Sequence, residues 1–228
     1  MRLVNKFVAA CVSAAIGICA ASDGASAEEY KYKNAEPKFK PASKDAEMAA
    51  AARKLGDPPK LTEKQQTEVD EGEVVIREVK GGGEGKRYEA IAVVKAPPKA
   101  VMAFLRDFKA FVGPMPNLKK IEFTWDGNVA HVTQWLKVAI TTVSYRLNIA
   151  HYGDSVIEWE FVEGDIKDTT GYYKFFPRAE GRETLLVYHV YTDPGMAVPQ
   201  FIINLLTKSS MPGVIEAIRT AVAKRAGK

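Results

Sequence analysis

The end of the chain most constrains what it can fold into, because it predicts one long amphipathic helix. Apolar residues recur at spacings of three and four between Ala197 and Lys224, which is the period of a helix face. Pro212 and Gly213 fall inside this pattern. A proline inside a helix loses a hydrogen bond and clashes with the preceding turn, at a cost of about 3 kcal/mol. We therefore expect the helix to be interrupted there by a kink, and its apolar side to need a broad surface.

The residues upstream of Pro194 supply that surface, because they carry strand patterns. Ile121, Phe123 and Trp125 alternate with polar residues, as in a half-buried strand. Similar runs, most of them separated by glycine-containing turns, predict further strands at residues 129–138, 141–151, 157–161, 171–176 and 184–192. The expected fold class is α+β, with a curved antiparallel sheet wrapped around the long C-terminal helix.

Two shorter helices and a hairpin are expected before these strands. A helix is predicted from Thr62 to Glu71, followed by strands at 73–80 and 86–95. The glycine cluster at 81–85 lacks the Gly-Lys-Ser/Thr of a phosphate-binding loop and joins two strand-like runs, so it predicts a hairpin turn. Pro97-Pro98 opens the second helix. The apolar, proline-rich loop from Phe111 to Asn117 is then expected to form a lid or a buried corner.

The first 27 residues match a secretory signal peptide. Arg2 and Lys6 give a positive start, an apolar run extends from Phe7 to Ala21, and Ala25-Ser26-Ala27 has a small-x-small cleavage pattern. We expect cleavage after Ala27 and a periplasmic or secreted mature protein. A membrane anchor is disfavoured because the apolar run is shorter than about 20 residues and rich in alanine.

The mature chain is expected to begin with a linker and to lack thiols. Cys11 and Cys19 both lie in the predicted signal peptide, which excludes a disulfide or a cysteine-ligated metal in the mature protein. A lipid-modified cysteine is disfavoured, because Cys11 lies too early and Cys19 follows a bulky isoleucine. Residues 28–60 are charged and poor in large aliphatics, which predicts a flexible linker containing one weak helix after Ser43. The folded domain is expected to span residues 61–228.

Motifs for catalysis, metals or nucleic acids are not evident. His131, His151 and His189 do not fall into a metal-binding spacing, so we interpret them as structural residues and expect no metal or cofactor. Glu158 and Glu160 alternate with aromatic residues and are expected to face away from them, which disfavours a glycosidase-like pair. The net charge of +4 is spread along the chain without a basic run, so no nucleic-acid partner is predicted.

Several motifs resemble the START/SRPBCC superfamily, whose architecture is the helix-grip fold. Ala96-Pro97-Pro98 through Phe108 resembles the entry to the first helix of these proteins, and Met115 to Lys120 resembles the turn that follows it. The later pattern resembles the polyketide-cyclase/coenzyme Q-binding branch, with Tyr173 standing where a tryptophan is commoner. Its residues are Trp159, Gly164, Gly171, Tyr173, Thr184, Tyr188, Pro194 and Gly195. The resemblance covers roughly residues 70–225.

This resemblance implies a cavity between the sheet and the C-terminal helix that holds an apolar ligand. The candidate ligand-binding residues are mostly aromatic and lie on strand or helix faces that are expected to point inward, although core filling alone explains at least half of them. Tyr145, Tyr173 and Tyr188 are the residues expected to orient one polar group of the ligand. The full set is Phe104, Phe108, Phe111, Met115, Trp125, Tyr145, Trp159, Phe161, Tyr173, Phe175, Tyr188, Phe201, Leu205, Met211 and Ile215.

Three functions are compatible with such a chain. The favoured one is an exported, non-catalytic carrier of a bulky hydrophobic molecule, such as a lipid, a sterol-like molecule, a hopanoid or a quinone, with transient membrane contact. The second is a cyclase or dehydratase that uses the same cavity and needs an acid–base pair on inward strand positions. The third is an interaction module with a filled core, whose strand faces bear Tyr172 or His189 as a partner surface.

Overall fold

The computed structural model describes residues 54–81, 85–138, 141–193, 195 and 200–227, with side chains for all of these except 138, 141 and 200–209. The predicted signal peptide, the weak helix after Ser43 and the turn at residues 82–84 therefore lie outside the described residues. So do the side chains of Phe201 and Leu205.

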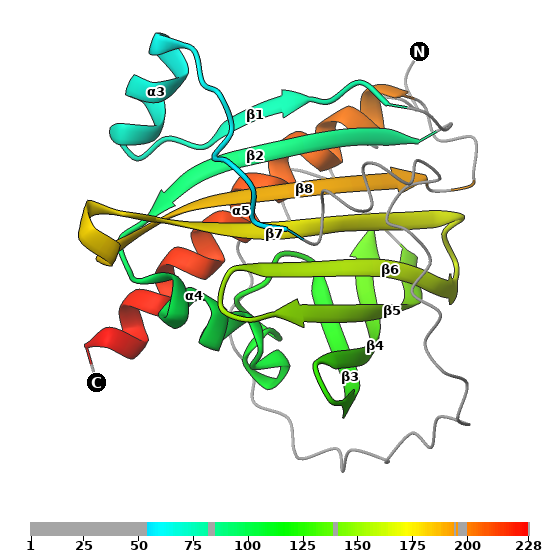
Figure 1. Cartoon of the computed structure of the whole chain (residues 1–228). Helices are drawn as coiled ribbons and strands as arrows, with labels where there is room; N and C mark the ends of the chain where they lie inside the picture. Colours follow the sequence, from blue (N-terminus) through cyan, green and yellow to red (C-terminus); the bar gives the residue numbers. More distant parts are fainter. Residues whose placement is uncertain (1–53, 82–84, 139–140, 194, 196–199, 228) are drawn as a thin grey trace.

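The centre of the fold is one eight-stranded sheet in which every pair of neighbouring strands is antiparallel. The spatial order is β1-β2-β8-β7-β6-β5-β4-β3, so the last strand in sequence lies between the first hairpin and the rest. Figure 1 shows the sheet curving, with β3 and β4 standing at a steep angle to β7 and β8. The strands are β1 (Val75–Glu78), β2 (Lys86–Val94), β3 (Leu118–Asp126), β4 (Val129–Val138), β5 (Thr141–Tyr152), β6 (Val156–Gly164), β7 (Asp168–Arg178) and β8 (Glu183–Asp193).

These strands confirm the alternating patterns of the sequence, and the short helices are also where the sequence predicts them. Helix α3 (Glu63–Asp70) begins with a capping box, in which Thr62 and Gln65 each accept a hydrogen bond from the other's backbone N–H. Helix α4 (Pro98–Leu105) starts at the expected proline pair. Two short 3₁₀ turns, η2 (Phe108–Ala110) and η3 (Ala179–Gly181), complete the connections.

The long C-terminal helix α5 (Gln200–Ala226) is continuous, with Pro212 inside it. The helix is therefore not divided at Pro212-Gly213, and the kink predicted there stays a prediction. Local propensity is a weak determinant when tertiary packing opposes it. Met211, Ile215 and Ile218 on either side of the proline are buried, and this packing offsets the hydrogen bond that proline removes.

The main core lies between α5, α4 and one face of the sheet, which we call the inner face. Val101 and Phe104 of α4 pack with Ile215 and Ile218 of α5, and all four are completely buried. The sheet contributes Ala92, Ile157, Phe175 and Leu186 to the same cluster. Each such side chain contributes about 1.5–3 kcal/mol through burial, so this cluster anchors the second half of α5 on the sheet.

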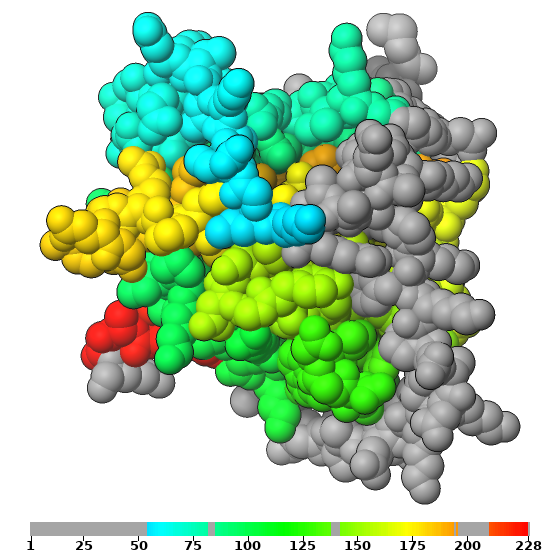
Figure 2. Space-filling model, in the orientation of Figure 1, coloured from blue at the N-terminus to red at the C-terminus, as the bar shows by residue number. Residues whose placement is uncertain are grey.

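A second apolar cluster lies on the opposite face, which we call the outer face. Phe176, Leu185 and Val187 of the sheet pack there with Val69 of α3. Leu55 and Leu61, which precede α3, pack against the same cluster. Figures 1 and 2 show the segment before α3 crossing this face of the sheet. The last part of the predicted linker is thus in contact with the domain.

Candidate functional site

The predicted ligand-binding residues separate into a packed group and a partly accessible group. Phe104, Phe108, Met115, Trp159, Phe175, Met211 and Ile215 are buried, with at most 8% of their surface exposed. Phe111, Tyr145, Phe161, Tyr173 and Tyr188 keep intermediate accessibility. Trp125 lies on the edge strand β3 and is 41% exposed, so it is a rim residue and not an interior one. Met211 and Ile215 of α5 are buried in the apolar clusters that the helix forms with the sheet.

Two of the partly accessible residues, Tyr173 and Tyr188, form a cluster of aromatic rings with the buried Trp159 on the inner face of β6, β7 and β8. The ring centroids of Tyr173 and Tyr188 are 4.7 Å apart, and those of Trp159 and Tyr173 are 5.3 Å apart. Met211 of α5 packs at the edge of this cluster, against Tyr88 and Tyr188. The cluster therefore lies next to the centre of the long helix.

Two glycines make room for these rings. A Cβ at Gly171 on β7 would collide with the Trp159 ring and with the His189 carbonyl of the neighbouring strand. Gly164 has φ +143° and lies opposite Tyr145 across β5 and β6, where a side chain would meet the Tyr145 backbone. Only glycine combines that conformation with such a close approach.

The hydroxyls of Tyr173 and Tyr188, and that of Tyr145 on the nearby strand β5, form hydrogen bonds. Tyr173 and Tyr188 bond to each other, and Gln134 of β4 bonds to Tyr145. Burial raises the pKa of Tyr145 to about 12 and raises the pKa values of Tyr173 and Tyr188, so all three hydroxyls stay protonated at neutral pH. These three rings keep intermediate accessibility, so they are candidates for contact with a molecule bound between the inner face and α5.

Sequence reasoning did not single out Gln134. The sequence could have indicated it, because side chains alternate between the two faces along β4. Gln134 lies two residues from Val132, which is buried on the inner face, so both point inward. A lone glutamine in such a position needs a hydrogen-bonding partner, and here Tyr145 provides it.

A second aromatic group surrounds η2 at the end of the inner face that β3 borders. Phe108 contacts Phe111, Phe123 and Trp125, with ring centroids 5.2–5.6 Å apart. The His151 ring is tilted against the Trp125 ring with 5.0 Å between centroids, and burial lowers the pKa of this histidine to about 4. His151 is therefore neutral at physiological pH. In the predicted lid, Val112 is 47% exposed whereas Met115 is buried, so that loop is partly a buried corner.

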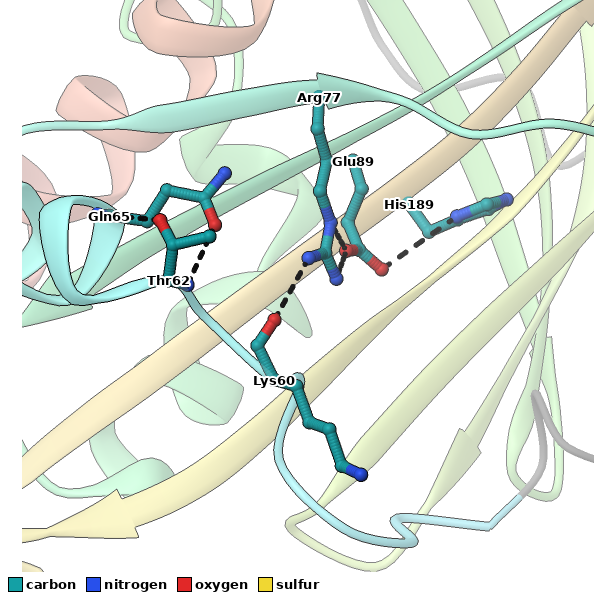
Figure 3. A network of polar contacts seen from close by, with 6 residues as sticks. All are labelled: Lys60, Thr62, Gln65, Arg77, Glu89 and His189. Carbon is teal, nitrogen blue, oxygen red and sulfur yellow. Dashed lines mark hydrogen bonds and ion pairs between the residues drawn. The ribbon is translucent and has the colours of Figure 1, made fainter.

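The outer face carries most of the charged residues of the sheet. Glu89 accepts a hydrogen bond of 2.7 Å from Arg77 Nε and lies 4.0 Å from His189 Nδ1, as Figure 3 shows. The His189 ring stacks on Tyr172 at 4.8 Å, and burial lowers the pKa of His189 to about 4. Figure 3 also shows Arg77 reaching the carbonyl of Lys60, at 3.1 Å. This network ties the segment before α3 to the sheet, so Tyr172 and His189 have a structural role there.

Glu158 and Glu160 also lie on the outer face, away from Ile157 and Trp159, as the alternation predicts. Tyr152 donates a hydrogen bond of 3.2 Å to Glu158, and Asn148 donates one of 3.0 Å to Glu160. A shallow hollow of about 20 Å³ on the same face, over β3 to β5, is lined by residues including His131 and Arg146 and has room for about one water molecule. These residues do not contribute to the aromatic cluster on the inner face.

Metal and membrane features are limited in the part of the chain that the structure describes. Within it, no three side chains of histidine, cysteine, aspartate or glutamate come together as a metal site would require. None of its helices is long and apolar enough to cross a membrane.

Comparison with known proteins identifies the fold. No sequence profile of a protein family matches the chain, and no curated protein sequence matches it significantly. Solved structures do match. An aromatase/cyclase, Zhui, from a Streptomyces species has a TM-score of 0.55 at 17% identity, over 67% of this chain and 96% of that one. A START superfamily protein from Mycobacterium smegmatis has a TM-score of 0.54 at 14% identity, over 60% and 97% of the two chains.

A STAR-related lipid transfer protein from Xanthomonas axonopodis has a TM-score of 0.53 at 16% identity, over 65% of this chain and 98% of that one. At such low identities, the likeness is one of fold and not of activity. Together with the order of strands and helices, it confirms the helix-grip fold that the sequence predicts. The chain has the α+β helix-grip fold of the START/SRPBCC superfamily, with an antiparallel sheet curved around its C-terminal helix.

Proposed function

We propose that the protein is an exported carrier that holds one bulky hydrophobic molecule between the inner face and α5. The proposal rests on Tyr145, Tyr173 and Tyr188. Their hydroxyls are desolvated, their side chains keep accessible surface, and their neighbours are apolar. Ligand sites are mostly apolar with a few convergent polar groups, and this cluster has that composition. The ligand class is a lipid, a sterol-like molecule, a hopanoid or a quinone.

One feature supports a carrier over an enzyme. Inward strand positions from β4 to β8 in the described residues carry no carboxylate that could form an acid–base pair with His151. The fold itself is compatible with both functions, because its solved structures include proteins named for lipid transfer as well as aromatase/cyclases. Removal of the signal peptide would place the carrier in the periplasm or outside the cell, where it would exchange its ligand through transient contact with a membrane.

A pair of tryptophan substitutions tests the proposed cavity. Val143 has the inward parity of Tyr145 on β5 and is partly accessible, whereas its neighbour Thr142 points outward and is exposed. Val143→Trp should fill the space beside Tyr145 and abolish saturable binding of a fluorescent sterol, with little change in melting temperature. Thr142→Trp is the matched control and should bind the probe normally. Equal binding by both variants would contradict the cavity, and so would the absence of saturable binding by the unmodified protein.

Export is tested separately by the intact mass of the mature protein. We expect the chain to start at Glu28. A retained N-terminus, or a mass increment from a lipidated cysteine, would contradict the proposed export route.

A further inference from the structure

We propose that the ligand is electrically neutral and offers an acceptor oxygen to the tyrosine hydroxyls of the inner face. This inference rests on the proposed carrier function and narrows its substrate class. Ketones, quinones, esters and alcohols satisfy it, whereas carboxylates, sulfates and phosphates do not.

The first argument is the distribution of charge between the two faces of the sheet. The outer face carries Glu89, Lys174 and Glu158, among other ionisable residues. The inward positions of β4 to β8 that the structure describes carry apolar residues, glycine, threonine, tyrosine, Gln134 and His151, and none carries a full charge at neutral pH. An anionic group placed among them would lose its hydration without gaining a counter-charge, which is far more costly than burying a neutral polar group.

The second argument is the count of hydrogen-bond donors. Each tyrosine hydroxyl has one proton to donate. The bond between Tyr173 and Tyr188 uses one of their two protons, so one is left. We take the Gln134 amide as the donor in its bond to Tyr145, which leaves the Tyr145 proton for a ligand. Two donors therefore remain for a ligand, and a ligand oxygen that accepts from them satisfies the site.

A pair of probes that differ in charge and by a single methyl group tests this inference. Oleic acid and its methyl ester, each delivered from cyclodextrin, should compete with a fluorescent sterol for the mature protein at pH 8. We expect the ester to displace the sterol at a concentration at least about tenfold lower than the acid does, because only the acid must bury a carboxylate.

Tyrosine variants test the role of the donors in the same assay. Tyr145→Phe and Tyr188→Phe should each weaken ester binding about fivefold, the usual effect of one lost hydrogen bond. Tyr172→Phe is the matched control, because Tyr172 is adjacent to Tyr173 on β7 but faces outward. It should leave ester binding unchanged. Equal binding by all three variants would contradict the assignment of the donors.

A lysine variant separates failure of this inference from failure of the carrier function. Lys208 is the one charged residue that the sequence places between Gln200 and Gly213 of α5. If the acid binds more tightly than the ester and Lys208→Met removes that preference, the ligand is anionic. In that case the inference of a neutral ligand is wrong, but the proposed carrier function stands. If neither the sterol nor either oleoyl probe binds, the carrier function itself fails.

Discussion

Replacing Gly171 with alanine should destabilise the domain strongly, because this position has no room for a Cβ. The new atom would collide with the Trp159 ring and also with the His189 carbonyl on β8. The carbonyl cannot rotate away without breaking the β7–β8 ladder, which pairs Gly171 with Val190. We therefore expect a cost near the upper end of the usual range for overpacking, about 3 kcal/mol. For a domain of this size, that corresponds to a fall in Tm of about 6–12 °C.

Gly213→Ala is the matched control, with the same chemical change and the opposite expected sign. A Cβ at Gly213 would meet only Pro116, at 3.5 Å, which is an ordinary contact. Because Gly213 lies inside α5, alanine should stabilise the helix by up to about 1 kcal/mol. Both variants are to be compared by thermal unfolding followed by circular dichroism. A Gly171→Ala protein that melts with the wild type would refute the close packing of Trp159 on β7, and with it the geometry of the aromatic cluster.

Three further predictions concern stability. His151 and His189 have pKa values lowered from 6.5 to about 4, so the unfolded chain binds more protons than the folded chain between these pH values. The free energy of unfolding in urea should therefore reach its full value above pH 6.5 and fall toward pH 4. This fall should be smaller in His189→Gln. Arg77→Ala leaves the buried Glu89 without its ion-pair partner and should lower the free energy of unfolding in urea by about 2–3 kcal/mol. Lys86→Ala, which removes the exposed ion pair with Glu78, should lower it by less than about 1 kcal/mol. EDTA should change neither Tm nor binding of the sterol probe, and a lower Tm in EDTA would reveal a metal site that the described residues do not contain.

Much of the fold is predictable from the sequence, because strand alternation reports which residues share a face. Trp159, Tyr173 and Tyr188 are expected on one face by this rule, and their rings do meet. Glu158 is expected on the other face and lies there, bonded to Tyr152. Such predictions succeed because burial of one face determines the register of a strand.

The parts that fail depend on packing between distant segments. Pro212 predicts an interruption by a kink, whereas the structure shows a helix that runs through it. The contacts of α5 with α4 and the sheet, which no local pattern reveals, support this continuity. Periodicity places Ile215 on the inward side of the helix without showing whether it meets a ligand or Phe104, and it packs in the same cluster as Phe104. Trp125 has inward parity, but its strand lies at the sheet edge, which leaves the ring exposed.

Mass spectrometry of the mature protein in its native state, purified without detergent from its own host, tests the central claim most directly. The account predicts a chain that begins at Glu28 and carries one neutral hydrophobic molecule, which organic extraction releases in equimolar amount. Tyr145→Phe and Tyr188→Phe proteins should retain less of it. A mature protein that carries no molecule, and whose organic extract contains no lipid above the level of an unrelated exported protein, would contradict the account.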